Sequence, residues 1–338
     1  MEMDVDTFLV AVYATVDDLY RERYAAAKPR RPGPAPVLSD SEVITLALLE
    51  QWRSDHSERK FVAFVRTHWQ SYFPHMLSQS AFNRRVRDLT GVLCRLGPDV
   101  CQVLQRHLGS PSYEVIDAVP VPLMRRRRGE QHRLFADEAQ VGRGGTDRSW
   151  FYGCSVLDAV MPEGGITGFV VGPARTEGHW LADTLLRWRH DPTAPVATAQ
   201  ELRVALGPDH PNQRIGPTGP IHGRLAVGTA ISSLYLGDGG FRGRYWHEHW
   251  KTAYGARVAT TADPGVTCQL HAWYASARQV VETVHSCLVG TFGLTFPGAR
   301  TAWGLLARLA AKVAAFNVAL LINVCVGRPR FSIFNPLP

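Results

Sequence analysis

Two aspartates occupy positions from which their carboxylates can meet at one edge of a sheet. Asp117 follows the β-rich run 113–116, and Asp238 follows the apolar run 234–236. Both are interpreted as strand ends, which is where α/β sheets usually bind ligands. Glycines follow Asp238 and let another backbone come close. Taken singly, each aspartate is more often a turn cap than a metal ligand.

A third carboxylate, Glu282, lies in a segment with helical periodicity. At about 100° per residue, Glu282 shares one helix face with Arg278 and His285, and the adjoining face is apolar. We therefore expect a helix packed on the sheet with this polar stripe over the sheet's edge. An alternative is that Arg278 and Glu282 form only an i,i+4 surface salt bridge.

Three carboxylates gathered at one point repel each other unless a hard divalent cation binds among them. The expected cofactor is magnesium, with manganese able to substitute, bound as two ions by Asp117, Asp238 and Glu282. Two such ions about 4 Å apart can activate a water or a 3′-hydroxyl and stabilise the leaving oxygen of a phosphodiester. The chemistry predicted from these residues is in-line phosphoryl transfer.

The elements that must position these residues begin with a helical region. A stiff proline-containing linker at 28–36 interrupts it, because proline cannot continue a helix. The second helix starts at a Ser-x-x-Glu capping box. The expected helices span residues 4–27, 39–52, 57–72 and 80–107.

The start of the 80–107 helix carries arginines around an apolar seam of Phe82, Val86 and Leu89. A recognition helix needs this arrangement, because its first turns present donors to DNA while its other face packs. The predicted DNA contacts in this helix are Arg84, Arg85 and Arg87.

Strand-like patterns replace helical ones from residue 112 onward. Three runs in succession, 113–117, 150–157 and 168–171, predict an antiparallel meander. Helices and strands then alternate, which favours an α/β sheet with helices on both faces. The segment 191–228 is rich in proline, glycine and polar residues and is expected to be an insertion or a mobile functional segment. The remaining elements are expected at 179–188, 234–236, 245–254, 256–261, 276–293 and 300–326.

Composition predicts a folded protein with a polyanionic partner. The chain has 338 residues, 45% of them hydrophobic, and a net charge of +7. Of its 37 basic residues only four are lysine, so 37 − 4 = 33 are arginine, whose planar fork suits phosphate. Six scattered cysteines suggest reduced thiols in a cytosolic protein. The apolar stretch 313–326 is short for a membrane span and is expected to be a buried core helix.

An ordered set of segments resembles one known family. They begin with Leu38–Leu46 and Phe73–Arg85, and continue with Ile116–Val121 and the arginines after it, Trp150–Gly153, Gly237–Gly243, Arg278–Glu282, and Arg300 through Asn323. Together they resemble the bacterial insertion-sequence DDE transposases, which have a ribonuclease H-like catalytic domain. The spacings, 238 − 117 = 121 and 282 − 238 = 44 residues, leave room for the elements that such a fold requires.

The resemblance implies a fold, an activity and a set of residues. It implies a helical DNA-binding region at 1–110, a ribonuclease H-like mixed sheet flanked by helices at 111–326, and a tail at 327–338. It implies cleavage and strand transfer at double-stranded DNA with terminal inverted repeats, by a homodimer in the nucleoid of the cytoplasm, without a membrane. Asp117, Asp238 and Glu282 would be the metal ligands. The expected DNA contacts are Arg84, Arg85, Arg87, Arg125, Arg126, Arg127, Arg128, Arg242, Arg278, Arg308 and Lys312.

This chain departs from the family where relatives often carry lysine. Gly239 follows the second aspartate, and Val289 stands beyond Glu282. These changes remove phosphate contacts and leave the predicted metal ligands in place. A competing interpretation is therefore a catalytically inactive or repurposed DNA-binding protein that keeps the fold. A ribonuclease H-like nuclease without end specificity is a third hypothesis, and a small-molecule α/β enzyme is the weakest, because it explains neither the arginines nor the N-terminal helices.

Overall fold

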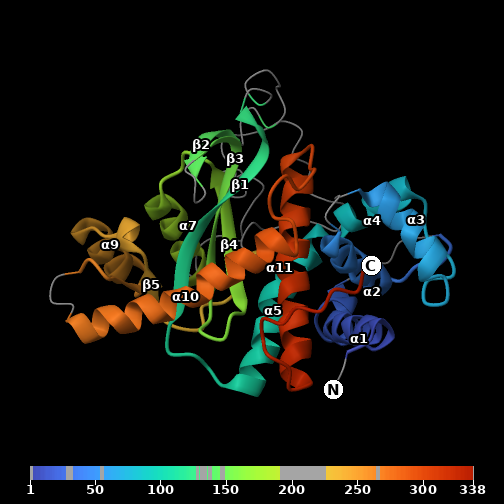
Figure 1. The fold of residues 1–338 in the computed structure, drawn as a ribbon, viewed down its shortest axis with the longest axis horizontal. Coiled ribbons are helices and arrows are strands. Elements are labelled where there is room, and N and C mark those ends of the chain that lie inside the picture. The colour runs from blue at the N-terminus through green and yellow to red at the C-terminus, as the bar shows by residue number, and fades with distance from the viewer. Residues whose placement is uncertain are drawn as a thin grey trace.

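A curled mixed sheet lies at the centre of the molecule, with helices on both faces (Figure 1). The structure is a computed structural model. It describes residues 3–27, 33–53, 57–126, 129, 135, 139–144, 149–190, 226–263 and 267–337. The predicted linker at 28–36 and insertion at 191–228 fall largely outside these residues, as do Arg127 and Arg128.

The strands of the sheet run in both directions. β3 is antiparallel to β1 on one edge, while β2 and β4 share its other edge. β5 and β6 continue the sheet beyond β1, each parallel to its neighbour, so the order is β2-β3-β1-β5-β6 with β4 beside β3. The strands are β1 (Glu114–Arg125), β2 (Gln140–Gly144), β3 (Ser149–Val160), β4 (Ile166–Pro173), β5 (Leu234–Gly237) and β6 (Arg257–Thr260).

β1 is longer than the sequence predicted, and Asp117 does not end it. The strand continues to Arg125 through Pro120 and Pro122, and Asp117 is its fourth residue. β5 pairs with β1 only as far as Val115, so the rest of that edge of β1 has no strand beside it among the described residues. Proline lacks an amide hydrogen and is tolerated on such an edge, which is why the two prolines did not stop the strand. β2 was not predicted at all.

Helices cover each face of the sheet through apolar side chains. On one face, α7 (Gly178–His190) and α9 (Arg244–Tyr254) pack against Ile116, Tyr235 and Val258. On the other face, α10 (Cys268–Gly290) packs against Val115 and Leu236. In Figure 1, α10 runs across the strands and α11 stands beside them. Alternate residues of a strand point to opposite faces, which explains why neighbouring positions belong to different cores.

The described N-terminal residues form helices, and the second of the α-helices starts at the predicted capping box of Ser39 and Glu42. The single helix expected over 80–107 is wrong: the chain breaks at Leu89 into two helices. Leu89 is buried and serves as the cap of both, so its packing outweighs the continuous helical pattern. The elements are α1 (Val5–Arg23), η1 (Ala25–Ala27), α2 (Asp40–Leu49), η2 (Glu50–Trp52), α3 (Glu58–His68), α4 (Gln79–Asp88) and α5 (Thr90–Leu108).

α11 (Ala302–Cys325) is the central helix of the apolar core, as the sequence predicted for 313–326. Among the described residues it is the one helix long and apolar enough to cross a membrane, and 94% of its most apolar window is buried inside the molecule. It packs on α5, α2 and α1, and the same core extends to β1 and β4. The N-terminal helices and one face of the sheet therefore share a single core.

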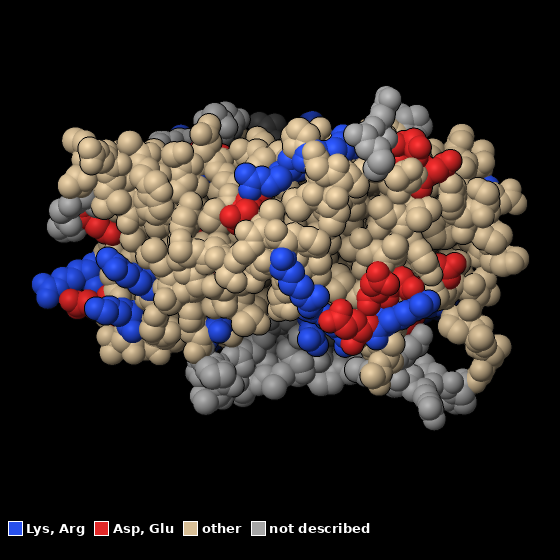
Figure 2. All heavy atoms as spheres, turned by 90° about the horizontal axis from the view of Figure 1, so that it is seen from below, with Lys and Arg blue, Asp and Glu red and all other residues tan. Residues whose placement is uncertain are grey.

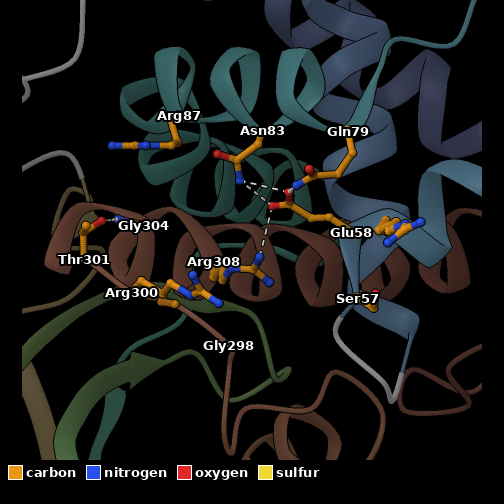
Figure 3. A pocket seen from close by; sticks show the side chains of 12 residues that line it. Ser57, Glu58, Gln79, Asn83, Arg87, Gly298, Arg300, Thr301, Gly304 and Arg308 are labelled. Atoms are coloured by element: carbon orange, nitrogen blue, oxygen red, sulfur yellow. Dashed lines mark hydrogen bonds and ion pairs between the residues drawn. The ribbon is translucent and has the colours of Figure 1, made fainter. Parts of the chain in front are cut away.

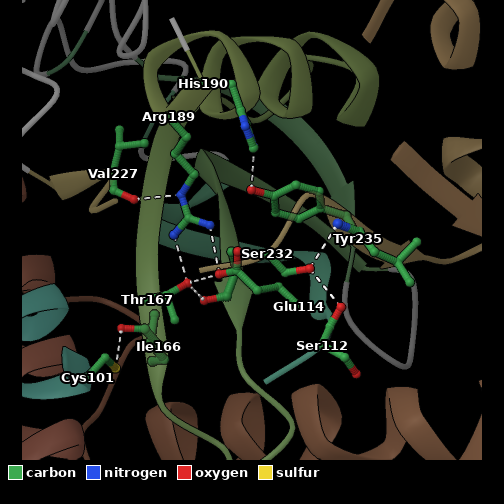
Figure 4. Close-up of polar contacts among 12 residues, drawn as sticks. Cys101, Ser112, Glu114, Ile166, Thr167, Arg189, His190, Val227, Ser232 and Tyr235 are labelled. Carbon is green, nitrogen blue, oxygen red and sulfur yellow. Dashed lines mark hydrogen bonds and ion pairs between the residues drawn. The ribbon is translucent and has the colours of Figure 1, made fainter. Parts of the chain in front are cut away.

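A buried ion pair ties β1 to α7, on the face of the sheet opposite α10. The Arg189 guanidinium donates to Glu114 Oε1 at 2.8 Å and to Thr167 Oγ1 at 2.7 Å, and its Nε donates to the Val227 carbonyl (Figure 4). Both charged side chains are fully buried. Glu114 is also the register partner of Tyr235 in β5. The pair therefore lies at the junction of β1 and β5.

Replacing Arg189 with methionine will leave the Glu114 carboxylate buried without its cation. We expect the free energy of unfolding in urea to fall by about 3–5 kcal/mol, the usual cost of removing one partner of a buried pair. The double variant Glu114→Gln/Arg189→Met removes both charges, and its free energy of unfolding should fall by clearly less. Equal losses in the two variants would show that the ion pair does not hold this junction.

Candidate active site

The register of the parallel strands brings Asp117 and Asp238 together. Glu114 of β1 is the partner of Tyr235 in β5, an offset of 235 − 114 = 121 residues. The same offset separates Asp117 from Asp238, since 238 − 117 = 121. Asp238 directly follows β5 and keeps an extended backbone, with φ −76° and ψ 175°. Neighbouring strands lie about 4.8 Å apart, so the two aspartates are adjacent across the sheet.

Both aspartates point to the face that α10 covers. Val115 and Leu236, two residues before them, belong to the core on this face, and side chains repeat every second residue along a strand. Asp158 of β3 is the register partner of Asp117 and therefore faces the same side. This face of the sheet thus carries three carboxylates in neighbouring strands.

α10 contributes the remaining polar groups. Its N-cap is Thr267, whose side chain accepts from the Leu270 amide, and Val281 and Val284 bury its apolar face on the sheet. The predicted polar stripe is present: Arg278 and His285 are half-buried at the sheet. Glu282 lies between them on the helix and is exposed.

Asp117 is in an environment that disfavours its charge. Burial raises its pKa above the ordinary value, and the nearby charges of Asp158 and Asp238 act in the same direction. His285 and the Ala118 amide oppose the shift; this amide donates to Asp117 Oδ1 at 2.8 Å. A bound cation relieves the repulsion between like charges in such a poorly solvated site.

His285 supplies positive charge to this site. Its Nε2 lies 3.0 Å from Asp158 Oδ1, and Asp158 is 1% exposed. Burial alone would lower the pKa of His285, yet the charge and hydrogen bond of Asp158 raise it, and Asp117 and Glu282 add to this effect. Protonated His285 therefore partly neutralises the carboxylates around it.

Arg278 is beside Asp117, not beside the neighbouring glutamate. Its Nη2 lies 3.8 Å from Asp117 Oδ2, and the i,i+4 salt bridge with Glu282 that the sequence left open is absent among the described contacts. The Arg278 Nε atom is buried and has no hydrogen-bond acceptor in the described part of the chain. A buried donor without an acceptor is unusual and is a natural contact for an incoming anion.

Asp238 also caps the short helix η4 (Gly239–Phe241), the structural role that the sequence left open. Its Oδ1 accepts from the Gly240 amide at 2.8 Å. A Cβ at position 240 would lie 2.8 Å from the same oxygen, so glycine is needed for this approach. The capping bond uses one carboxylate oxygen and fixes the orientation of Asp238.

The structure brings two of the three predicted ligands together and leaves the third apart. Asp238 acts on the charge of Asp117, whereas Glu282 is exposed and acts on His285. Within the described residues, no three side chains of Asp, Glu, His or Cys lie close enough to hold one ion. For Glu282 to complete the set, its side chain must swing from solvent toward the aspartates.

The predicted DNA contacts fall into two groups. Arg125 and Arg126 are exposed, and the extended β1 places Arg125 roughly 26 Å along the strand from Asp117, so these arginines do not lie beside the carboxylates. Arg126 lies over the Trp150 ring at 5.3 Å. Arg84, Arg87, Arg125, Arg126 and Arg242 are exposed, and their contact with DNA stays a prediction.

Other predicted contacts are engaged inside the protein. Lys312 is 1% exposed and donates to Gln51 Oε1 and to the Phe292 carbonyl, so its assignment to DNA is wrong. Burial lowers the pKa of Lys312 to about 7, and Arg308 acts in the same direction. The helical periodicity of α11 could not show that this lysine lies on the buried side.

Arg85 and Arg308 form ion pairs with buried acids. Arg85 Nη2 lies 2.6 Å from Asp40 Oδ1, and Arg308 Nη2 lies 3.0 Å from Glu58 Oε1. Arg85 thereby ties α4 to the start of α2, a structural role that was not predicted from the sequence.

Asp158 and its contact with His285 were not predicted from the sequence. A detectable signal was present, because Asp158 interrupts the otherwise apolar run Val156–Val160 of a strand. A buried carboxylate in a strand requires a partner, and His285 is that partner. Which residue supplies the partner depends on the packing of α10 and is not visible in the sequence.

Comparisons with known proteins give no match to any family model, curated protein or solved structure.

Replacing Asp158 with asparagine will lower the pKa of His285 below its value in the unmodified protein, because burial then acts with less opposition. The group's pKa is raised in the folded state, so its stabilising effect is full below the ordinary value of 6.5 and is lost as pH rises through the folded pKa. NMR titration of the His285 ring, with a chelator present, measures the shift. Urea unfolding across the same pH range should show weaker pH dependence in Asp158→Asn, and an unchanged profile would refute the pairing.

Proposed function

We propose that this chain is a metal-dependent enzyme that cleaves and joins DNA strands in the manner of a DDE transposase. The observation that carries the proposal is that Asp117, on β1, lies beside Asp238, which directly follows the parallel strand β5. The expected substrate is double-stranded DNA with terminal inverted repeats. Holding two such ends calls for at least a dimer.

The strand order supports a ribonuclease H-like assignment. Three antiparallel strands, β4, β3 and β1, precede two strands, β5 and β6, that add in parallel beyond β1. Helices follow β4, β5 and β6 in turn. In this arrangement the first aspartate lies on the central strand, the second after its parallel neighbour, and the glutamate on the last of these helices. Asp117, Asp238 and Glu282 match that distribution.

The chemistry of the donors suits magnesium or manganese. Asp117, Asp238 and Glu282 offer carboxylate oxygens. Burial is the main cause that raises the pKa of Asp117, and the charges of Asp158 and Asp238, which a cation would offset, act in the same direction. When bound, the ions would activate a water or a 3′-hydroxyl as the nucleophile and stabilise the leaving oxygen in an in-line phosphoryl transfer. Asp238, oriented by its bond to Gly240, and Asp117, bonded to the Ala118 amide, are held in fixed positions before any ion binds.

Arg278 and Arg242 are the cations best placed to hold a DNA phosphate near the aspartates. Arg278 has a buried Nε without an acceptor among the described residues, and Arg242 is exposed four positions after Asp238. The face drawn in Figure 2 is mostly uncharged, and its basic side chains lie in small groups near acidic ones. DNA contact therefore depends on a few localised arginines and not on a uniformly basic face there.

A second candidate is an inactive DNA-binding protein that keeps this fold. The observation that favours it is His285, whose positive charge acts on Asp158, Asp117 and Glu282 from within the carboxylate group. An internal cation there competes with metal ions for the same carboxylates. The two candidates differ in whether the carboxylates bind metal and support cleavage.

Substituting Asp117 with asparagine is expected to abolish cleavage of cognate DNA ends while leaving DNA affinity unchanged. Removing a carboxylate that contacts the ions should lower activity by more than the 10–100-fold that is typical when a residue hydrogen-bonded to a metal ligand is removed. Asp238→Asn and Glu282→Gln should behave alike, and Glu248→Gln, an exposed residue of α9, is the matched control. Cleavage by Asp117→Asn at the unmodified rate, measured on labelled duplex ends, would exclude this site.

Manganese should stabilise the unmodified protein against unfolding and have little effect on Asp117→Asn. At a free concentration one hundred times Kd, binding to the folded state adds about 2.7 kcal/mol to the free energy of unfolding. Differential scanning calorimetry with and without manganese measures the effect. Equal behaviour of both proteins would favour the inactive DNA-binding protein.

A further inference from the structure

A cavity of about 520 Å³ lies between the N-terminal helices and the start of α11 (Figure 3). α4 forms one wall, α11 and the preceding loop form the opposite wall, and the first turn of α3 closes one side. None of the candidate carboxylates of the active site lines it. Its volume is within the range of small-ligand sites and exceeds the space that a single small anion needs.

The lining is strongly basic. Four arginines, Arg59, Arg87, Arg300 and Arg308, and one acid, Glu58, give it a formal charge of 4 − 1 = +3. Arginine in such numbers around one space suits a phosphate group, because its planar fork donates two parallel hydrogen bonds to phosphate oxygens.

Glu58 is occupied by groups of the cavity itself. It is 9% exposed, and Arg308 Nη2 donates to its Oε1 at 3.0 Å. Asn83 Nδ2 and Gln79 Nε2 donate to Glu58 from α4 at 2.7 Å and 2.8 Å. These bonds connect α3, α4 and α11, so Glu58 and Arg308 serve as the fixed floor of the cavity.

The other three arginines have no such partner in the part of the chain that the structure describes. Arg59, Arg87 and Arg300 are exposed, and no acidic residue in the described part of the chain forms an ion pair with any of them. Each guanidinium therefore keeps its donors available at the mouth of the cavity. Exposed cations held together without counter-charges repel one another in the unliganded protein and attract a polyanion.

The walls that carry these arginines are held in position. Trp303 Nε1 donates to the Arg87 carbonyl at 3.4 Å, which joins the start of α11 to the end of α4. Thr301 caps α11 by accepting from the Gly304 amide at 3.1 Å. Both α11 and α3 begin at the cavity, and the positive ends of their helix dipoles add to the arginine charge.

We propose that this cavity binds the phosphodiester backbone of DNA, at a site separate from the carboxylates. The proposal rests on the proposed function for the identity of the polyanion. Arg84 lies three residues before Arg87 on α4 and is also exposed, so a backbone that leaves the cavity along α4 meets a further cation. Contacts of this kind fix the position of a duplex and carry little sequence information.

The test compares two triple variants with the same change in charge. Arg59→Gln/Arg87→Gln/Arg300→Gln removes the three unpaired cations, and Arg106→Gln/Arg257→Gln/Arg330→Gln removes three exposed arginines outside the cavity. Binding to a random-sequence duplex is measured by fluorescence anisotropy over a range of salt concentrations. Circular dichroism melting checks that both variants fold.

The cavity variant should lose about tenfold to a hundredfold in affinity at low salt, and its salt dependence should weaken by a slope of about 3, one for each phosphate contact. The control variant should change little in either quantity. Equal affinities and slopes in the two variants would overturn the proposal. A second result would also overturn it: the cavity variant keeps the duplex affinity of the unmodified protein, and the only change is that added inorganic phosphate no longer competes.

Failure of this proposal is distinguishable from failure of the proposed function. If the unmodified protein binds DNA through the cavity but never cleaves it, the cavity assignment stands and the enzymatic one falls. If it cleaves DNA and the cavity variant binds like the control, the enzymatic assignment stands and the cavity one falls. Absence of any duplex binding by the unmodified protein would overturn the cavity assignment.

Discussion

The pairing of β1 with β5 is the constraint on which the candidate active site depends. Two residue pairs join these strands, Glu114 with Tyr235 and Val115 with Leu236. They set the positions of Asp117 and Asp238. A slip of one residue would turn one aspartate to the opposite face. The buried Glu114–Arg189 pair holds the strand three residues before Asp117, so a contact on the α7 face determines the geometry on the α10 face.

Local sequence patterns predicted most of the elements, and the errors have specific physical causes. The capping box at Ser39, the buried helix α11 and the strand before Asp238 follow from patterns within a few residues. β1 ran past its predicted end because the absence of a neighbouring strand on one edge, among the described residues, permitted Pro120 and Pro122. An unpaired edge is a property of the sheet and leaves no local signal.

The candidate site also combines features that the sequence predicted with features that only the packing determines. The equal offset of 121 residues is present in the sequence, but its meaning appears only once Glu114 is known to pair with Tyr235. The helical face of Arg278, Glu282 and His285 was predictable, whereas the pairing of Arg278 with Asp117 and of His285 with Asp158 follows from how α10 crosses the sheet. Lys312 shows the reverse: a charged residue suggested the surface, and packing placed it in the core.

The segment between α10 and α11 joins the two proposed sites. It leaves α10 a few residues after His285, and its Phe296 amide donates to the Pro122 carbonyl of β1 at 2.7 Å. Buried Lys312 holds the Phe292 carbonyl of the same segment at 2.6 Å, and the segment then reaches Arg300 at the cavity. A duplex bound at Arg300 therefore contacts a chain anchored to β1, α10 and α11. These anchors fix the path of the segment between α10 and the cavity, so the position of Arg300 is set by the same packing that places α10 on the sheet.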